Sequence, residues 1–183
     1  MRKINAVITP LILVLFLVHM IWGGLELAGM TKGGNALFSV LSRLLLALVC
    51  VHVLVSVWLT VRTLRTVRRS GASYTKENRL FWIRRGSGFA LMLLLAAHVL
   101  LMSGTTRSGA YRLNLFAGSQ LAVQILMVLA LLVHLACNIT PLRIALGLED
   151  PRKLRIDLLL VLTVLLLLAG AAFVIYFIRW QTV

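Results

Sequence analysis

Long blocks of apolar residues alternate with short polar connections along this chain. A helix needs about 20 mostly apolar residues to cross the hydrocarbon core of a bilayer. Five blocks reach that length, and the third is the weakest because glycines and serines complete both of its ends. The pattern therefore predicts membrane-spanning helices over residues 5–24, 37–61, 87–105, 118–139 and 156–178.

The composition supports a membrane protein. Of 183 residues, 61% are hydrophobic and 13% are charged, whereas a soluble domain carries roughly a quarter charged residues. The five blocks fill most of the chain and leave no room for a folded soluble module. We therefore expect an all-α integral membrane bundle of five transmembrane helices, forming one domain over residues 1–183.

Basic residues are distributed unequally between the two predicted sides of the membrane. Because Lys and Arg favour the inner side, this distribution predicts an inside N-terminus and an outside C-terminus. The net charge of +14 follows from this topology, so we expect no nucleic-acid partner. Anionic lipid headgroups and an acidic inner subunit are both possible partners of the basic inner loop. The inner residues are Arg2, Lys3, Arg62, Arg65, Arg68, Arg69, Lys76, Arg79, Arg84, Arg85, Arg143, Arg152, Lys153 and Arg155, the outer ones are Lys32, Arg107, Arg112 and Arg179, and Arg43 lies within the second span.

Each of the first four predicted spans contains one histidine: His19, His52, His98 and His134. At 1.5 Å of rise per residue, His19 and His98 lie roughly 22 and 17 Å from the inner surface. His52 and His134 lie roughly 13 and 8 Å from it. The histidines therefore divide into an outer pair, His19 with His98, and an inner pair, His52 with His134.

Ionisable side chains inside a membrane are candidates for function, because hydrocarbon leaves their polar atoms unsatisfied. Hydrogen bonding to a neighbouring helix is the alternative for any one histidine. A bare metal ion would need three or four converging ligands, whereas these histidines come in twos. Two histidines on opposite sides of one iron are the ligands of haem b. The layout thus predicts two b haems, with all four histidines as iron ligands.

One chain with five helices and a histidine on each of the first four resembles the di-haem cytochrome b anchors of succinate dehydrogenases and fumarate reductases. The segment "SGASYTKENRLFWIRRGSGFA" is also similar to the loop and third-helix start of these anchors. The resemblance is closest to the single-subunit type of menaquinone-using bacteria, and it covers almost the whole chain.

This resemblance implies several further expectations. His19 and His98 would bind the distal haem, and His52 and His134 the proximal haem. An inner iron–sulfur subunit and a flavoprotein subunit would be partners, and menaquinone would be the membrane substrate. The complex would lie in the bacterial cytoplasmic membrane, and this chain alone would not act on a dicarboxylate.

Unusual polar residues near the outer face suggest a quinone site. We interpret Glu26 as the proton acceptor, because it follows His19 by seven residues on the same helix face. Arg43, Gln120 and Gln124 are candidates to bind haem propionates or the quinone. Simple solvation of Glu26 at the interface is the alternative.

Two other functions remain open from the sequence. The chain could be a cytochrome b anchor of another quinone-linked oxidoreductase, although such anchors often carry two histidines on one helix. It could also be a haem-free membrane scaffold or transporter. The direction of electron flow is open as well.

Overall fold

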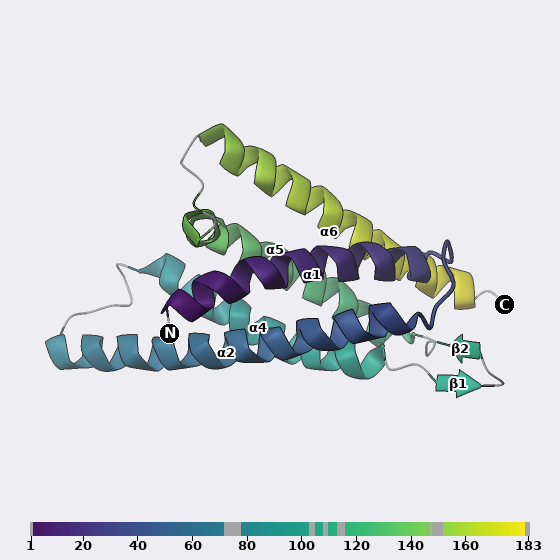
Figure 1. Ribbon diagram of the computed structural model, residues 1–183, viewed down its shortest axis with the longest axis horizontal. Coiled ribbons are helices and arrows are strands. Elements are labelled where there is room, and N and C mark those ends of the chain that lie inside the picture. Colours follow the sequence, from purple (N-terminus) through teal and green to yellow (C-terminus); the bar gives the residue numbers. More distant parts are fainter. Residues whose placement is uncertain are drawn as a thin grey trace.

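Five long helices run lengthwise through the computed structural model, which describes residues 2–71, 78–102, 105–107, 110–112, 116–145, 147 and 152–181 (Figure 1). Each is long and apolar enough to cross a membrane, so the expected all-α membrane bundle is confirmed and the chain is a multi-pass membrane protein. The helices are α1 (Arg2–Leu27), α2 (Ala36–Ser70), α4 (Arg79–Leu101), α5 (Gly118–Ala145) and α6 (Arg152–Gln181).

The largest differences from the predicted spans are in α2 and α4. The helix α4 begins eight residues before the predicted start at residue 87, because backbone hydrogen bonding continues through the basic segment that precedes the apolar block. It ends at Leu101, not at residue 105. The helix α2 continues beyond residue 61 to Ser70 and stops at Gly71, whose left-handed φ of 67° suits glycine. This basic extension is about 14 Å long.

A short antiparallel hairpin follows α4, and the apolar pattern did not predict it. Its strands are β1 (Thr105–Arg107) and β2 (Ala110–Arg112), with Thr106 opposite Tyr111. Three-residue strands carry too little alternation to be read from a sequence. The hairpin lies at the same end of the bundle as the C-terminus (Figure 1).

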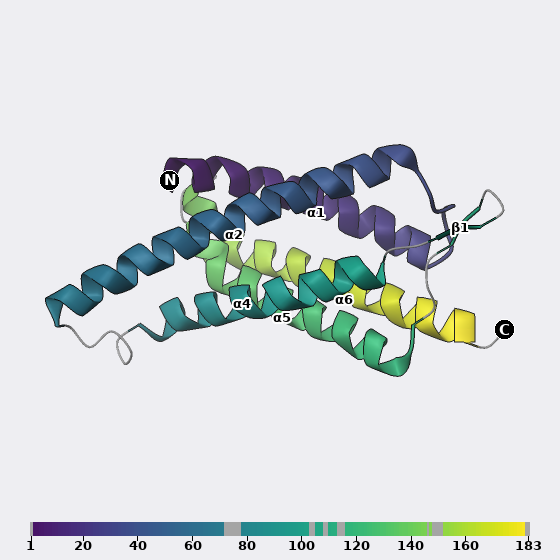
Figure 2. The same cartoon turned by 90° about the horizontal axis from the view of Figure 1, so that it is seen from below.

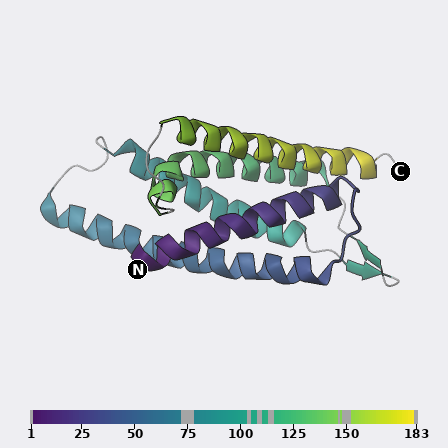
Figure 3. The same cartoon turned by 45° about the horizontal axis from the view of Figure 1, so that its top comes forward.

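The helices form two layers, with α1 and α2 in one and α4, α5 and α6 in the other (Figure 2). The helix α5 packs against both α4 and α6, and α6 lies beside it along much of its length (Figure 3). The helix α1 also contacts α5 and α6, whereas α2 packs closely against α1. The start of α1 and the basic end of α2 lie toward the same end of the bundle (Figure 1). Which end faces the cell interior stays a prediction.

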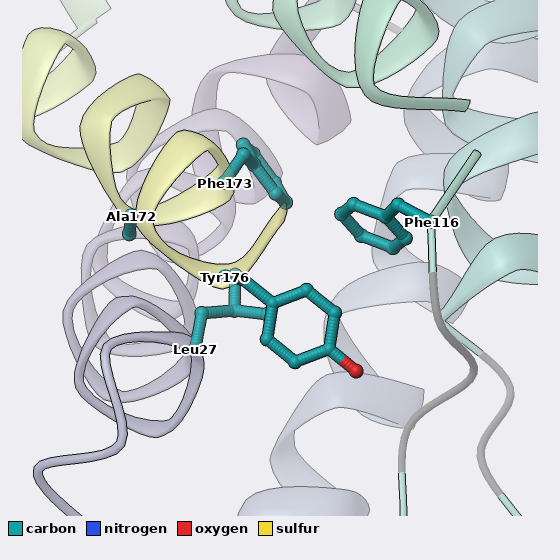
Figure 4. Close-up of a cluster of buried hydrophobic side chains, with 5 residues drawn as sticks. All are labelled: Leu27, Phe116, Ala172, Phe173 and Tyr176. Carbon is teal, nitrogen blue, oxygen red and sulfur yellow. The ribbon is translucent and has the colours of Figure 1, made fainter. Parts of the chain in front are cut away.

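A cluster of buried side chains closes the other end of the bundle. Phe116, which precedes α5, packs edge-on against Tyr176 with ring centres 5.0 Å apart, and Phe173 lies beside it (Figure 4). Leu27 and Ala172 complete the cluster, so it joins the end of α1 to α6. Arg179 adds a hydrogen bond of 2.9 Å to the carbonyl oxygen of Ala28.

Candidate functional site

The outer histidines meet between the two layers. His19 extends from α1 and His98 from α4, and their ring centres are 6.3 Å apart with planes at 79°. A metal–nitrogen bond of about 2 Å and a nitrogen-to-ring-centre distance of about 1 Å place two opposed imidazoles about 6 Å apart. The observed spacing therefore suits two imidazoles that share one metal between them.

The inner histidines, His52 on α2 and His134 on α5, are near enough for their charges to be coupled, and the charge of Arg85 on α4 is coupled to both. The guanidinium of Arg85 lies over the ring of Phe81, 5.1 Å from its centre. Each histidine pair thus joins one helix of the α1–α2 layer to one helix of the other layer.

Serine hydroxyls fix the rings of two histidines. The Nδ1 atom of His19 lies 3.0 Å from Oγ of Ser42, which donates its own hydrogen to the carbonyl of Phe38 at 2.8 Å. The Nδ1 atom of His134 lies 3.1 Å from Oγ of Ser87, which donates to the carbonyl of Arg84 at 3.2 Å. A serine hydroxyl has one hydrogen, so when it donates to the carbonyl of its own helix, its oxygen accepts from the histidine Nδ1.

Gln124 holds the ring of His98 in a similar way. The Nδ1 atom of His98 lies 2.7 Å from Oε1 of Gln124, an amide oxygen that can only accept. Gln124 is completely buried, with 0% of its surface exposed, so water cannot replace it. A neutral His98 therefore carries its proton on Nδ1 and keeps the lone pair of Nε2, which is the form that binds a metal, and His19 and His134 can take the same form beside their serines.

Unsatisfied polar atoms lie at both histidine levels. Among the described residues, Gln124 Nε2 at the outer level has no hydrogen-bond partner, and neither His52 Nδ1 nor Arg85 Nε at the inner level has one. All three atoms are buried, and an unsatisfied polar group inside a membrane is costly. Polar atoms of a bound group could satisfy the amide of Gln124 and the guanidinium of Arg85.

The residues proposed for a quinone or for propionates lie in different settings. Glu26 accepts a hydrogen bond of 3.0 Å from Nε1 of Trp22 on its own helix. Arg43 is exposed and donates to Ser39, one turn earlier. Gln120 accepts from the backbone N–H of Ala117 and so caps the start of α5. Within the described part of the chain, none of the hydrogen bonds of Glu26, Arg43 and Gln120 joins one of them to another, whereas Gln124 contacts a histidine.

An aromatic stack connects Glu26 to the outer pair. Phe38 of α2 stacks on His19, with ring centres 5.2 Å apart and planes at 14°. Trp22 stacks on the same phenylalanine at 6.0 Å and 15°. The chain of contacts from His19 through Phe38 and Trp22 therefore ends at the Glu26 carboxylate.

Sequence analysis did not identify the serines or Phe38 as parts of the site. One sequence signal could have identified the two serines, because each stands ten or eleven residues before a histidine on its own helix. Ser42 precedes His52, and Ser87 precedes His98. Among the described residues, no group of three or more His, Cys, Asp or Glu side chains could hold a bare metal ion.

Comparisons with known proteins were made by sequence and by structure. No protein-family model, no curated protein and no solved structure matches this chain.

Proposed function

We propose that the chain is a membrane cytochrome b that binds two b haems, one at each histidine level. His19 and His98 would bind the outer haem iron, and His52 with His134 the inner one, each through Nε2. The observation that carries this proposal is that Nδ1 of His19, of His98 and of His134 each lies 2.7–3.1 Å from an oxygen on a neighbouring helix. These contacts would leave Nε2 of each ring for an iron.

Bound haem supplies an iron that exchanges single electrons. The protein holds the ligand rings, excludes water and neutralises charge. Phe38 and Phe173 cover the outer rings, with Phe173 centred 6.1 Å from His98. Arg85, whose charge is coupled to both inner histidines, would pair with a propionate there. Ser42 contacts His19 and therefore marks the outer level on α2. His52 follows Ser42 by ten residues, so the outer and inner histidine levels are separated by about 15 Å along the helix.

We further propose that electrons pass between menaquinone and an inner iron–sulfur and flavin subunit pair of the succinate dehydrogenase or fumarate reductase type. Resemblance in the histidine layout supports this assignment. The basic extension of α2, with exposed Arg62, Arg65, Arg68 and Arg69, offers a positive surface to an acidic subunit. In this proposal the complex lies in the bacterial cytoplasmic membrane, and the dicarboxylate reaction belongs to the flavin subunit.

Quinol oxidation would take place beside Glu26. Quinol gives up two electrons and two protons, and the electrons pass one at a time to the outer level. Glu26 would accept the protons in turn and release them to outer water. Its partial exposure, and the stack from its partner Trp22 through Phe38 to His19, support this role.

A reduced-minus-oxidised optical spectrum of the purified protein tests the central proposal. We expect the absorption of b-type haem at two haems per chain. A colourless protein from cells supplied with haem would refute the proposal and leave a haem-free scaffold. Subunits that copurify with the chain then distinguish a succinate-type complex from another quinone-linked oxidoreductase.

A further inference from the structure

The consecutive helices α4 and α5 pack together as a helical hairpin, as α1 and α2 do. A groove runs along the surface of the α4–α5 hairpin. Ile83, Gly86, Ala90 and Leu94 line it from α4, and Ala130 is among the residues that line it from α5. The groove is almost entirely apolar and offers about 500 Å³, a volume within the range of roughly 300–1,000 Å³ that ligand pockets have.

The groove opens toward the bilayer. Ile83, Leu126, Leu129 and Val133 line it and remain exposed on the bundle, and both of its helices are long and apolar enough to cross a membrane. Leu94 follows Ile83 by eleven residues, so the groove extends along about 16 Å of α4. One leaflet of a hydrocarbon core about 30 Å thick is about 15 Å deep. The groove therefore matches one hydrocarbon chain of a single leaflet in length.

Two arginines stand at the end of the groove that is nearest the start of α4. Arg79 precedes Ile83 by four residues, so it lies one turn beyond the groove on the same helix face, and it is exposed. Arg84 reaches α5, where its Nε donates a hydrogen bond of 2.7 Å to the carbonyl of Cys137. Cys137 follows Val133 by four residues, so the guanidinium of Arg84 lies between the two helices at this end.

The hairpin supplies no acidic partner to these arginines, because α4 and α5 contain neither Asp nor Glu. Among the described residues, the only carboxylate side chains are Glu26 on α1 and Asp157 on α6. Basic pockets between membrane helices bind anionic lipid headgroups. An apolar groove one leaflet deep, with two positive charges at its end, fits a molecule that has a hydrocarbon chain and an anionic head.

We propose that the α4–α5 groove binds one phospholipid with an anionic headgroup. One acyl chain would lie along α4 between Ile83 and Leu94, and the headgroup phosphate would accept hydrogen bonds from Arg79 and Arg84. The charges favour this occupant over a quinone tail, whose ring is neutral. They also favour it over a helix from a second copy, because α4 and α5 of that copy would bring no carboxylate to the arginines.

This proposal does not depend on haem binding, and the charged end of the groove can be tested alone. Native mass spectrometry of the full-length protein compares phosphatidylglycerol with phosphatidylcholine of identical acyl chains. We expect the wild type to retain one phosphatidylglycerol in preference to phosphatidylcholine. Each basic residue near an anionic headgroup strengthens binding roughly fivefold. Arg79→Gln should therefore weaken phosphatidylglycerol binding roughly fivefold, and Arg79→Gln with Arg84→Gln roughly 25-fold.

Lys32→Gln is the matched control for charge. It removes one exposed positive charge from the connection between α1 and α2, at the other end of the bundle, and should bind phosphatidylglycerol as wild type does. Arg79→Gln leaves the hydrogen bond between Arg84 and Cys137 in place. The single variant therefore tests the headgroup site even where the double variant fails to fold.

Gly86→Leu tests the apolar part of the groove. An added Cβ at Gly86 meets nothing within 4 Å, so leucine can enter the groove and should displace the acyl chain of either lipid. Gly118→Leu is the matched control, because a Cβ at Gly118 also meets open space but Gly118 does not line the groove. Leucine favours a helix more than glycine does, so both variants should fold.

Several results would overturn the proposal. Equal retention of the two lipids by the wild type would exclude an anionic headgroup site, and so would equal losses in Arg79→Gln and Lys32→Gln. Unchanged lipid retention in Gly86→Leu would show that the acyl chain lies elsewhere. A bound quinone or a dimer that is lost in Gly86→Leu, in place of a phospholipid, would assign the groove to that other occupant.

Discussion

Replacement of Gln124 by leucine should weaken the outer haem site. Gln124→Leu keeps most of the side-chain volume but removes the oxygen that lies 2.7 Å from Nδ1 of His98. Since Gln124 is fully buried, no water can take its place. Leaving a buried N–H without an acceptor costs about 1–3 kcal/mol. That cost corresponds to outer haem binding roughly 5- to 150-fold weaker, since about 1.4 kcal/mol is a factor of ten.

The assay is haem content per chain, followed by redox titration of the purified protein. We expect Gln124→Leu to lose the outer haem or to raise its midpoint potential, while the inner haem stays as in wild type. Gln124→Glu supplies a stronger acceptor and should lower that potential. Gln120→Leu is the control, because Gln120 caps α5 and does not contact a histidine. An outer haem with wild-type content and potential in Gln124→Leu would refute the reasoning.

Three further changes test other parts of the molecule. Glu26→Gln should slow quinol oxidation with haem content unchanged, measured by steady-state turnover, and unchanged turnover would exclude the proton-acceptor role. Gly29→Ala should lower the thermal unfolding midpoint more than Gly71→Ala, because both positions have positive φ but an added Cβ at Gly29 also meets the Arg179 guanidinium. Phe173→Ala should destabilise the protein by about 3–5 kcal/mol in denaturant unfolding, and it should loosen the outer haem because Phe173 packs against His98.

The apolar blocks predict the helices well because each must bury its backbone polar groups internally within hydrocarbon. They predict the helix ends less well. An apolar block ends at the edge of the hydrocarbon core, whereas a helix continues for as long as its residues favour the helical backbone. The helix α2 therefore reaches Ser70 through basic residues, and α4 begins at Arg79 for the same reason. The end of α4 and the short hairpin after it depend on local geometry that hydropathy does not describe.

The division of the histidines into two levels follows from the sequence, because helical rise converts residue number into height, but the predicted depths put the levels closer together than the ten residues from Ser42 to His52 do. Which neighbour bonds to each ring is not predictable in the same way. A serine in an apolar helix commonly bonds its own backbone, and Ser42 and Ser87 do so while also facing a histidine. Gln120 and Gln124 are four residues apart, which suggests that they share a role. Gln124, however, is buried against His98, whereas Gln120 caps the start of α5.

In the proposed cytochrome, the ligand histidines would have a structural part as well as a redox one. Contacts at Nδ1 link His19, His98 and His134 to a neighbouring helix, and Nε2 of each ring would be left for the iron. The helix α2 packs closely against α1, so its connection to the other layer depends on the level of His52 and His134. A group bound between those two rings would therefore join α2 to α5, and the same bonds that orient the iron ligands would fix how the hairpins meet.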